Sequence, residues 1–254
     1  KAIPVDDPYN MYFTPDGKSA SIVAEALKRL DFGEPKTMAM QYSIDVPKCA
    51  GINHADFSID GRFAIFTCEF AGTVAKIDLV NRKVLGYTQV IQPGRPTTVV
   101  KGPDGKDEII CTTWKGMPQD IRASPDGKLF FVADMMADGV HVVDGESFRQ
   151  VGFIETGKGT HGLYPSRDGN KLYVANRGSN KIHGPPKGKG SVSVIDFATR
   201  KVDVTWPIPG GGSPDMGNVS ADGKTLWLSG RYDHVVYVFD TGSGAVTIIP
   251  VGKE

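Results

Sequence analysis

Two histidines have the clearest capacity for chemistry in this sequence. His54 and His161 lie at matching places in an internal repeat, shortly before the Asp-Gly pairs that begin at Asp60 and Asp168. Neutral imidazole binds zinc, iron and copper, and a carboxylate beside the ring fixes its tautomer. His54 and His161 are therefore candidate metal ligands, and Asp215 is the candidate carboxylate. A methionine added to this set would favour copper.

Polar residues recur at the same place in every copy of the repeat. They are Asn10, His54, Gln119, His161 and Asp215. If the strands that carry them converge on one axis, these side chains could bind a metal, the edge of a haem or a small ligand. The alternative is that they hydrogen-bond channel water and neighbouring loops, as polar residues at a channel mouth commonly do. Because more than a hundred residues separate the histidines, no local metal motif decides between the two interpretations.

The repeat that must position these residues is built around an Asp-Gly turn. The pairs begin at Asp16, Asp60, Asp126, Asp168 and Asp222. A β-rich run follows each pair, then a strand that ends in Asp, then a further strand. Since glycine tolerates a positive φ, Asp-Gly between two apolar runs predicts a tight turn between the first and second strands. Each copy is expected to form four antiparallel strands.

Four-stranded units repeated at this spacing are typical of a β-propeller, an all-β fold in which neighbouring blades cover each other's apolar faces. The expected blades of this single domain, residues 1–254, lie near 8–46, 49–90, 117–157, 158–211 and 212–251, with an inserted hairpin at about 96–114. Ala2–Val5 is expected to be the last strand of a blade whose other strands are absent. The five complete blades are therefore expected to belong to a six- or seven-bladed ring that lacks N-terminal blades here. A closed five-bladed ring is the alternative.

Several segments resemble the YVTN family of β-propeller repeat proteins. They are KLYVAN at Lys171–Asn176, SVSVIDFATRKV at Ser191–Val202 and SPDGKLFFVAD at Ser124–Asp134. The resemblance covers nearly the whole chain, and it implies a propeller similar to those of quinoprotein amine dehydrogenases and haem d1 proteins. Propellers that hold haem d1 or copper use histidines at the channel mouth. Because propellers of this kind have many functions, the resemblance implies a fold and leaves the function open.

Composition and missing motifs exclude several functions. The 29 Lys and Arg residues balance the 29 Asp and Glu residues, so no nucleic-acid partner is expected. The apolar runs are too short for a transmembrane helix. The sequence has no C-x-x-C-H haem attachment, no P-loop or dinucleotide fingerprint and no G-x-S-x-G nucleophile elbow. It therefore assigns no catalytic residue and requires no cofactor.

The three cysteines are Cys49, Cys68 and Cys111, too few for a disulfide scaffold and without zinc-ligand spacing. One disulfide plus one free thiol is compatible with this number. Cys68 ends an apolar strand and is interpreted as a core thiol. The cysteines alone therefore do not select a redox compartment.

Two hypotheses for function remain. The first is a non-catalytic bacterial propeller, secreted or periplasmic, that binds a protein partner or a small ligand through its loop face and central funnel. It rests on the regular repeats, the missing catalytic motifs and the long loops at 91–117 and 177–190. Three lysines of the second loop, Lys181, Lys187 and Lys189, are more typical of a solvated loop than of a docking site. The second hypothesis is an oxidoreductase or lyase with a metal, a haem or a small ligand at the funnel mouth.

Overall fold

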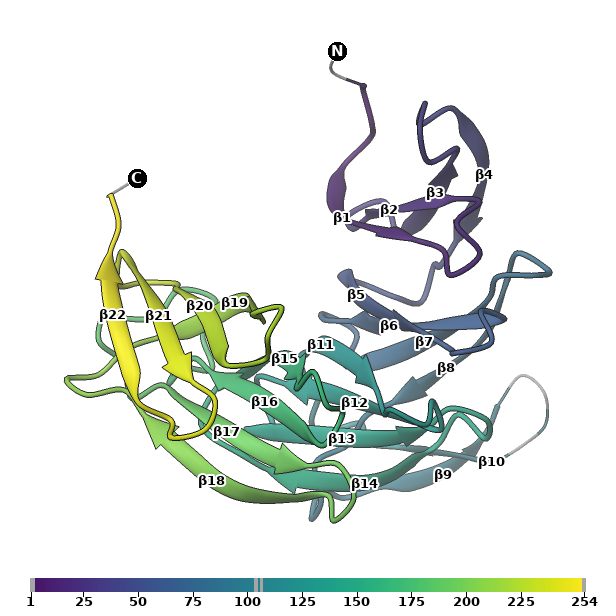
Figure 1. The fold of residues 1–254 in the computed structure, drawn as a ribbon. Helices are drawn as coiled ribbons and strands as arrows, with labels where there is room; N and C mark the ends of the chain where they lie inside the picture. The colour runs from purple at the N-terminus through teal and green to yellow at the C-terminus, as the bar shows by residue number, and fades with distance from the viewer. Residues whose placement is uncertain (1–2, 103–104, 106, 253–254) are drawn as a thin grey trace. The chain divides into compact units, whose positions relative to one another are not determined.

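The computed structural model describes residues 3–102, 105 and 107–252, and these residues form strands and turns but no α-helix. Five sheets have four strands each, which follow one another in chain order (Figure 1). The predicted all-β fold of five four-stranded units is therefore confirmed. Within the described residues, no helix has the length and apolar character needed to cross a membrane.

The sheets follow the repeats. The first consists of β1 (Pro8–Phe13), β2 (Ala20–Ala24), β3 (Arg29–Gly33) and β4 (Met40–Asp45). The second consists of β5 (Ile52–Phe57), β6 (Phe63–Cys68), β7 (Thr73–Asp78) and β8 (Lys83–Gln89). The third consists of β11 (Pro118–Ala123), β12 (Leu129–Asp134), β13 (Gly139–Asp144) and β14 (Gln150–Glu155). The fourth consists of β15 (Thr160–Pro165), β16 (Lys171–Asn176), β17 (Ser191–Asp196) and β18 (Lys201–Pro207). The fifth consists of β19 (Pro214–Val219), β20 (Thr225–Gly230), β21 (Val235–Asp240) and β22 (Val246–Pro250).

The chain forms two compact units. The first contains residues 1–130 and 143–151, and the second contains residues 131–142 and 152–254. In the first unit Phe32, Phe66 and Ile77 belong to one apolar core. In the second unit Trp206 and Tyr237 belong to another. The single domain and the larger ring expected from the repeats stay predictions.

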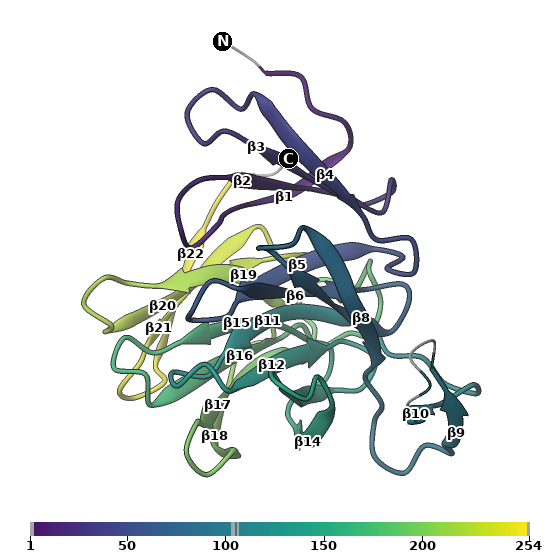
Figure 2. The ribbon, with the colours of Figure 1, turned by 90° about the vertical axis from the view of Figure 1, so that its right-hand side faces the viewer.

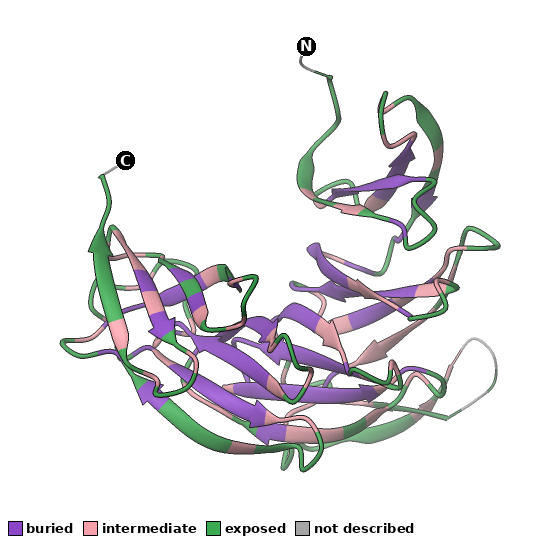
Figure 3. Ribbon diagram, in the orientation of Figure 1, coloured by how far each residue is buried: buried purple, intermediate pink, exposed green. Residues whose placement is uncertain are grey.

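Burial differs systematically between the strands of a sheet. The second strands β6 and β16 are buried along nearly their whole length, whereas the fourth strands β18 and β22 are mostly exposed (Figure 3). A strand covered on both faces needs an almost continuous apolar sequence, and FAIFTC in β6 has one. In the first four sheets the apolar run that follows the Asp-Gly turn therefore becomes a buried strand, whereas β20 in the fifth sheet alternates buried and exposed residues.

One hydrogen-bonded turn joins the first and second strands in all five sheets. A Ser or Thr hydroxyl donates to the turn carboxylate in the pairs Thr14–Asp16, Ser58–Asp60, Ser124–Asp126, Ser166–Asp168 and Ser220–Asp222. The same carboxylate accepts a backbone N–H two residues later. These hydrogen bonds hold the pKa of all five carboxyls below its ordinary value. The predicted position of the five turns is therefore observed.

Replacing Gly17 by valine is expected to lower the free energy of unfolding by about 1–3 kcal/mol, because valine is strained at positive φ. Gly17 has φ +67°, and a Cβ at this position would meet no atom within 4 Å. The loss would therefore come from the backbone alone. Gly17→Asn is the matched control, since asparagine tolerates this conformation. Denaturant unfolding measures both variants, and an equal loss for Val and Asn would contradict the strain argument.

A strand near the N-terminus and an inserted hairpin are both expected from the sequence. No described strand pairs with Ile3–Val5, and Ala2 lies outside the described residues, so the strand expected at Ala2–Val5, whose partners are expected to be absent, stays a prediction. A hairpin of β9 (Thr98–Lys101) and β10 (Asp107–Ile110) lies within the range 96–114 and follows β8 (Figure 2). Between its two strands, Pro103, Asp104 and Lys106 lie outside the described residues.

A disulfide joins Cys49 to Cys68 in the first unit. The pairing of Ile52 with Cys68 brings the start of β5 to the end of β6, so that the two cysteine Cα atoms lie 4.8 Å apart. The interpretation of Cys68 as a core thiol is therefore wrong. Among the described residues Cys111 is the free cysteine, and it is buried.

Candidate functional site

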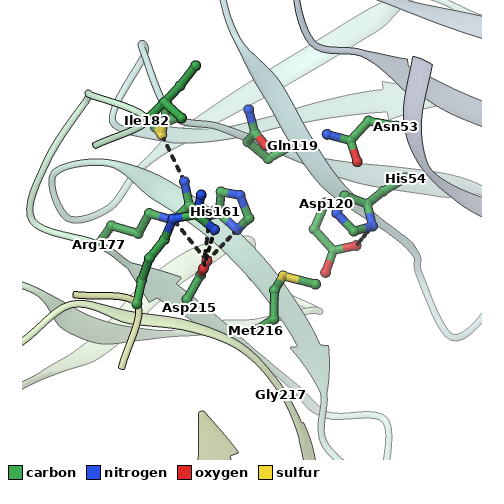
Figure 4. Close-up of polar contacts among 12 residues, drawn as sticks. Asn53, His54, Gln119, Asp120, His161, Arg177, Ile182, Asp215, Met216 and Gly217 are labelled. Atoms are coloured by element: carbon green, nitrogen blue, oxygen red, sulfur yellow. Dashed lines mark hydrogen bonds and ion pairs between the residues drawn. The ribbon is translucent and has the colours of Figure 1, made fainter. Parts of the chain in front are cut away.

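Three basic side chains surround one buried carboxylate in the second unit. Asp215 is 3 % exposed, and its Oδ1 lies 3.0 Å from Nδ1 of His161. Arg177 donates from Nε to Oδ1 at 2.8 Å and from Nη2 to Oδ2 at 3.1 Å (Figure 4). Arg231 donates from Nη1 to Oδ2 at 3.2 Å. We call these four residues the Asp215 cluster.

The register of the strands places these residues. His161 and Asp215 are each the second residue of a first strand, β15 and β19. Arg177 directly follows the second strand β16, and Arg231 directly follows the second strand β20. Because the start of each first strand pairs with the end of its second strand, a residue just past the second strand lies beside the first-strand position. Equivalent positions of two repeats thus supply the whole cluster.

The charges of the cluster keep Asp215 ionised. Burial alone would raise the pKa of Asp215, but hydrogen bonding with His161 and the Arg177 guanidinium hold it well below its ordinary value. Burial lowers the pKa of Arg231, and the opposing Asp215 carboxylate more than offsets this, so Arg231 stays cationic. Two guanidinium groups therefore face one carboxylate, which leaves one positive charge in excess.

Neighbouring groups fix the backbone and the side chains of the cluster. The hydroxyl of Tyr164 donates to the carbonyl oxygen of Asp215 at 3.0 Å and accepts the N–H of Gly217 at 3.0 Å. The Nη1 atom of Arg177 lies 3.5 Å from the sulfur of Met135. Hence Tyr164 anchors the start of β19, while Arg177 is held between a carboxylate and an apolar thioether.

A second cluster surrounds His54 in the first unit. Its Nδ1 lies 3.2 Å from Nδ2 of Asn10, 3.3 Å from the hydroxyl of Tyr12 and 4.0 Å from Oδ1 of Asp120. Figure 4 shows His54 beside Asp120, whose carboxylate also accepts Nη1 of Arg122 at 2.7 Å. Burial raises the pKa of Tyr12 to about 12, so its hydroxyl remains protonated at neutral pH. Two carboxylates, the half-buried Asp56 and the buried Asp120, act on the single guanidinium of Arg122 here, so this cluster has no excess of guanidinium groups.

The structure brings the sequence-predicted residues together in two pairs. Asn10 contacts His54 in the first unit, and His161 contacts Asp215 in the second. Gln119 also lies in the first unit, where its amide donates to the carbonyl of Met117. A metal shared by His54 and His161, and one ligand for all five residues, stay predictions. Among the described residues no group of three or more His, Cys, Asp and Glu side chains is placed to hold a metal ion.

Arg177 and Arg231 were missed by the sequence argument. They occupy one repeat position, the residue directly after the second strand. Across the five sheets this position holds Glu25, Glu69, Met135, Arg177 and Arg231. An alignment of the repeats at this residue, in addition to the Asp-Gly turn, would have shown a charged residue in four of the five copies, with both signs of charge. A change of charge at a structurally constant position is the signal that could have marked the site.

A model of the YNCE-like β-propeller family matches residues 108–254. The chain belongs to this family. The expected resemblance to propeller repeat proteins is thereby confirmed. No curated protein matches the sequence.

Solved structures share the fold at low sequence identity. Hydrazine synthase of Kuenenia stuttgartiensis superposes with a TM-score of 0.74 and 18 % identity over 100 % of this chain and 68 % of that chain. A catalytically inactive virginiamycin B lyase from Staphylococcus aureus, solved with quinupristin, superposes with a TM-score of 0.72 and 13 % sequence identity. The match covers 98 % of this chain and 71 % of that chain. The Cps50 (Swd1) propeller of Myceliophteria thermophila superposes with a TM-score of 0.58 and 13 % sequence identity. The match covers 99 % of this chain and 89 % of that chain. At these identities the likeness establishes the propeller fold of this YNCE-like chain and selects no function.

Proposed function

We propose that this YNCE-like chain is a bacterial β-propeller that acts outside the cytoplasm and binds a ligand at the Asp215 cluster. The observation that carries the proposal is the unequal charge of the cluster, two guanidinium groups against one carboxylate. Burial of an unpaired charge is costly, so a purely structural cluster would be expected to pair its charges one to one. The side chain of Arg231 keeps 37 % of its surface exposed, which leaves it accessible to a ligand.

The disulfide supports the location. Cys49 and Cys68 are both fully buried and joined. Disulfides persist in secreted and periplasmic proteins and are rare in the reducing cytosol. A cross-link within the core of the first unit is therefore what a secreted or periplasmic protein would contain.

A screen for ligands tests the binding function. Purified protein is heated with a library of small molecules, and a true ligand is expected to raise the melting temperature, because binding to the folded state stabilises it by mass action. The His161→Ala variant is expected to lose this response, whereas His183→Ala, which changes an exposed histidine in the same unit, is expected to keep it. If no compound stabilises the protein, or if both variants respond as the wild type does, binding at this cluster is wrong.

Acid–base catalysis is the second candidate, because His161 is paired with a buried carboxylate. Such a pairing holds an imidazole in one tautomer and one orientation, as in a general base. The virginiamycin B lyase that shares this fold is inactive in a variant with one histidine changed to alanine. Incubation with quinupristin followed by mass spectrometry tests lyase activity, and metal analysis with a visible spectrum tests for a metal or haem. Turnover that His161→Ala abolishes would favour the enzyme over the binding protein.

A further inference from the structure

The excess positive charge of the Asp215 cluster resides on Arg231. Arg177 engages both oxygens of Asp215 with two nitrogens, and its side chain is only 5 % exposed, so these two residues form a closed pair. Arg231 reaches the same carboxylate through Nη1 alone. Resting on the binding function proposed above, we propose that Arg231 binds the carboxylate group of a small-molecule ligand, with Asp215 and Arg177 as positioning residues.

The geometry of Arg231 suits this role. A guanidinium has five N–H groups arranged for two-point contact with a carboxylate. Since the contact with Asp215 uses one nitrogen and the side chain is partly exposed, Arg231 can form such a contact with a ligand. The backbone N–H of Arg231 donates to the carbonyl of Ser213 at 2.9 Å, and the guanidinium lies 5.9 Å from the ring of Tyr232. The backbone hydrogen bond fixes the residue, and the ion pair with Asp215 orients its side chain, before any ligand arrives.

The nearby carboxylate of Asp233 has other partners. Its oxygens accept the backbone N–H of Lys187, the backbone N–H of Ser213 and the hydroxyl of Tyr237. These contacts direct the Asp233 carboxylate to the loop and to β21. The charge of Arg231 is thus opposed by Asp215, which Arg177 already neutralises.

The loop 177–190 adds positive charge to the same end of the second unit. It contains Arg177 and three lysines but no acidic residue. Asn180 anchors it by donating to Oδ1 of Asp138 at 2.6 Å, and the hydroxyl of Tyr232 donates to the carbonyl of Lys181 at 3.2 Å. A basic loop held beside the residue that follows Arg231 attracts anions from solution.

The size of the excess charge selects a carboxylate over a phosphate. One positive charge remains in the cluster, and a carboxylate carries one negative charge on two oxygens that match the guanidinium. A phosphate dianion would bring one more negative charge than the excess guanidinium balances. A ligand with a single carboxylate at this position balances the excess guanidinium one to one.

Acetate and inorganic phosphate are the probes for this proposal. Each is titrated into isotope-labelled protein, and backbone amide resonances of Ser213 and Tyr232 report binding. Arg231→Gln is expected to weaken acetate binding by about tenfold, the effect of losing one charge-assisted pair. Arg231→Lys keeps the charge and the ion pair with Asp215 but loses the planar fork, so it is expected to weaken binding as well. Arg200→Gln makes the same change at an exposed position of the second unit and is expected to leave binding unchanged.

Three results would overturn the carboxylate proposal. They are equal acetate binding by the wild type and Arg231→Gln, phosphate binding tighter than acetate binding at the reporting amides, and no saturable binding of acetate.

The ligand screen separates this proposal from the binding function. A compound without a carboxylate whose binding needs His161 but not Arg231 would overturn the carboxylate proposal and leave the binding function intact, whereas a screen without any binder would overturn both.

Discussion

Replacing Asp215 by asparagine is expected to lower the free energy of unfolding by about 3–5 kcal/mol, the cost of breaking a buried ion pair by removing one partner. Asparagine keeps the volume and removes the charge that opposes Arg177, whose side chain is almost fully buried. The guanidinium would then remain in the protein interior without a counter-charge. Denaturant unfolding of the wild type and of Asp215→Asn measures the loss.

Asp203→Asn is the matched control, because Asp203 pairs with Lys171 at the surface and is 44 % exposed. Surface ion pairs contribute about 0–1 kcal/mol, so this variant is expected to lose little stability. Equal losses in the two variants would contradict the argument from burial.

A further check is Arg177→Met in the Asp215→Asn background. It removes the stranded charge and is expected to restore part of the stability, whereas simple additivity of the two changes would show that they do not interact.

The stabilisation by Asp215 also has a defined pH dependence. Its pKa is lower in the folded protein than its ordinary value of 3.8, so the folded state favours the ionised form. The stabilisation is therefore complete above the ordinary value and is lost as the pH falls from there toward the lower folded pKa. The stability difference between the wild type and Asp215→Asn is expected to shrink below about pH 4. A difference that stays constant to lower pH would show that the charge of Asp215 is not its source.

The turns and strands could be predicted from sequence because the interactions that define them are local. The hydroxyl of Ser58 and the carboxylate of Asp60, for example, are two residues apart, and Gly61 supplies the positive φ that the turn needs. Such a turn is complete within a few residues, so it leaves the same signature in every copy. The strand pattern follows from the turns, since an apolar run between two fixed turns has to form a strand.

The Asp215 cluster could be predicted only in part because it depends on contacts between distant residues. Sequence alignment on the turns identified His161 and Asp215, which are 54 residues apart, as equivalent positions. It did not identify Arg177, 38 residues before Asp215, because that residue follows a strand and belongs to no motif. The register of β15 with β16 and of β19 with β20 brings these residues together, and register is decided by the packing of whole sheets.

Residues that recur in every repeat have a different role in this fold from residues that vary between repeats. The turn carboxylates recur in all five sheets, which indicates a structural role. The position after the second strand changes from Glu25 and Glu69 in the first two sheets to Arg177 and Arg231 in the last two. A fold that needs one backbone geometry at this position can accept either charge there. The choice of charge is therefore available for function, and in the second unit it favours an anion.

Removing the disulfide with the double change Cys49→Ala and Cys68→Ala is expected to lower the free energy of unfolding by about 3 kcal/mol. The two cysteines are 19 residues apart, and a cross-link over a loop of this length restricts the unfolded chain by about that amount. Cys111→Ala is the control, since it removes a buried cysteine outside the disulfide and is expected to cost less. Denaturant unfolding measures all three proteins.

A thiol count on unfolded protein tests the same disulfide independently. Protein made in an oxidising compartment is expected to expose one thiol, that of Cys111, whereas protein made in a reducing cytosol is expected to expose three. The free energy of unfolding is expected to be higher for the oxidised preparation than for the reduced one, by about the difference between the wild type and the double variant. Three thiols in oxidised protein, or equal stability of the two preparations, would contradict the disulfide. Because the cross-linked cysteines lie in the core shared by β5 and β6, its loss would weaken the packing behind His54, the histidine carried by β5.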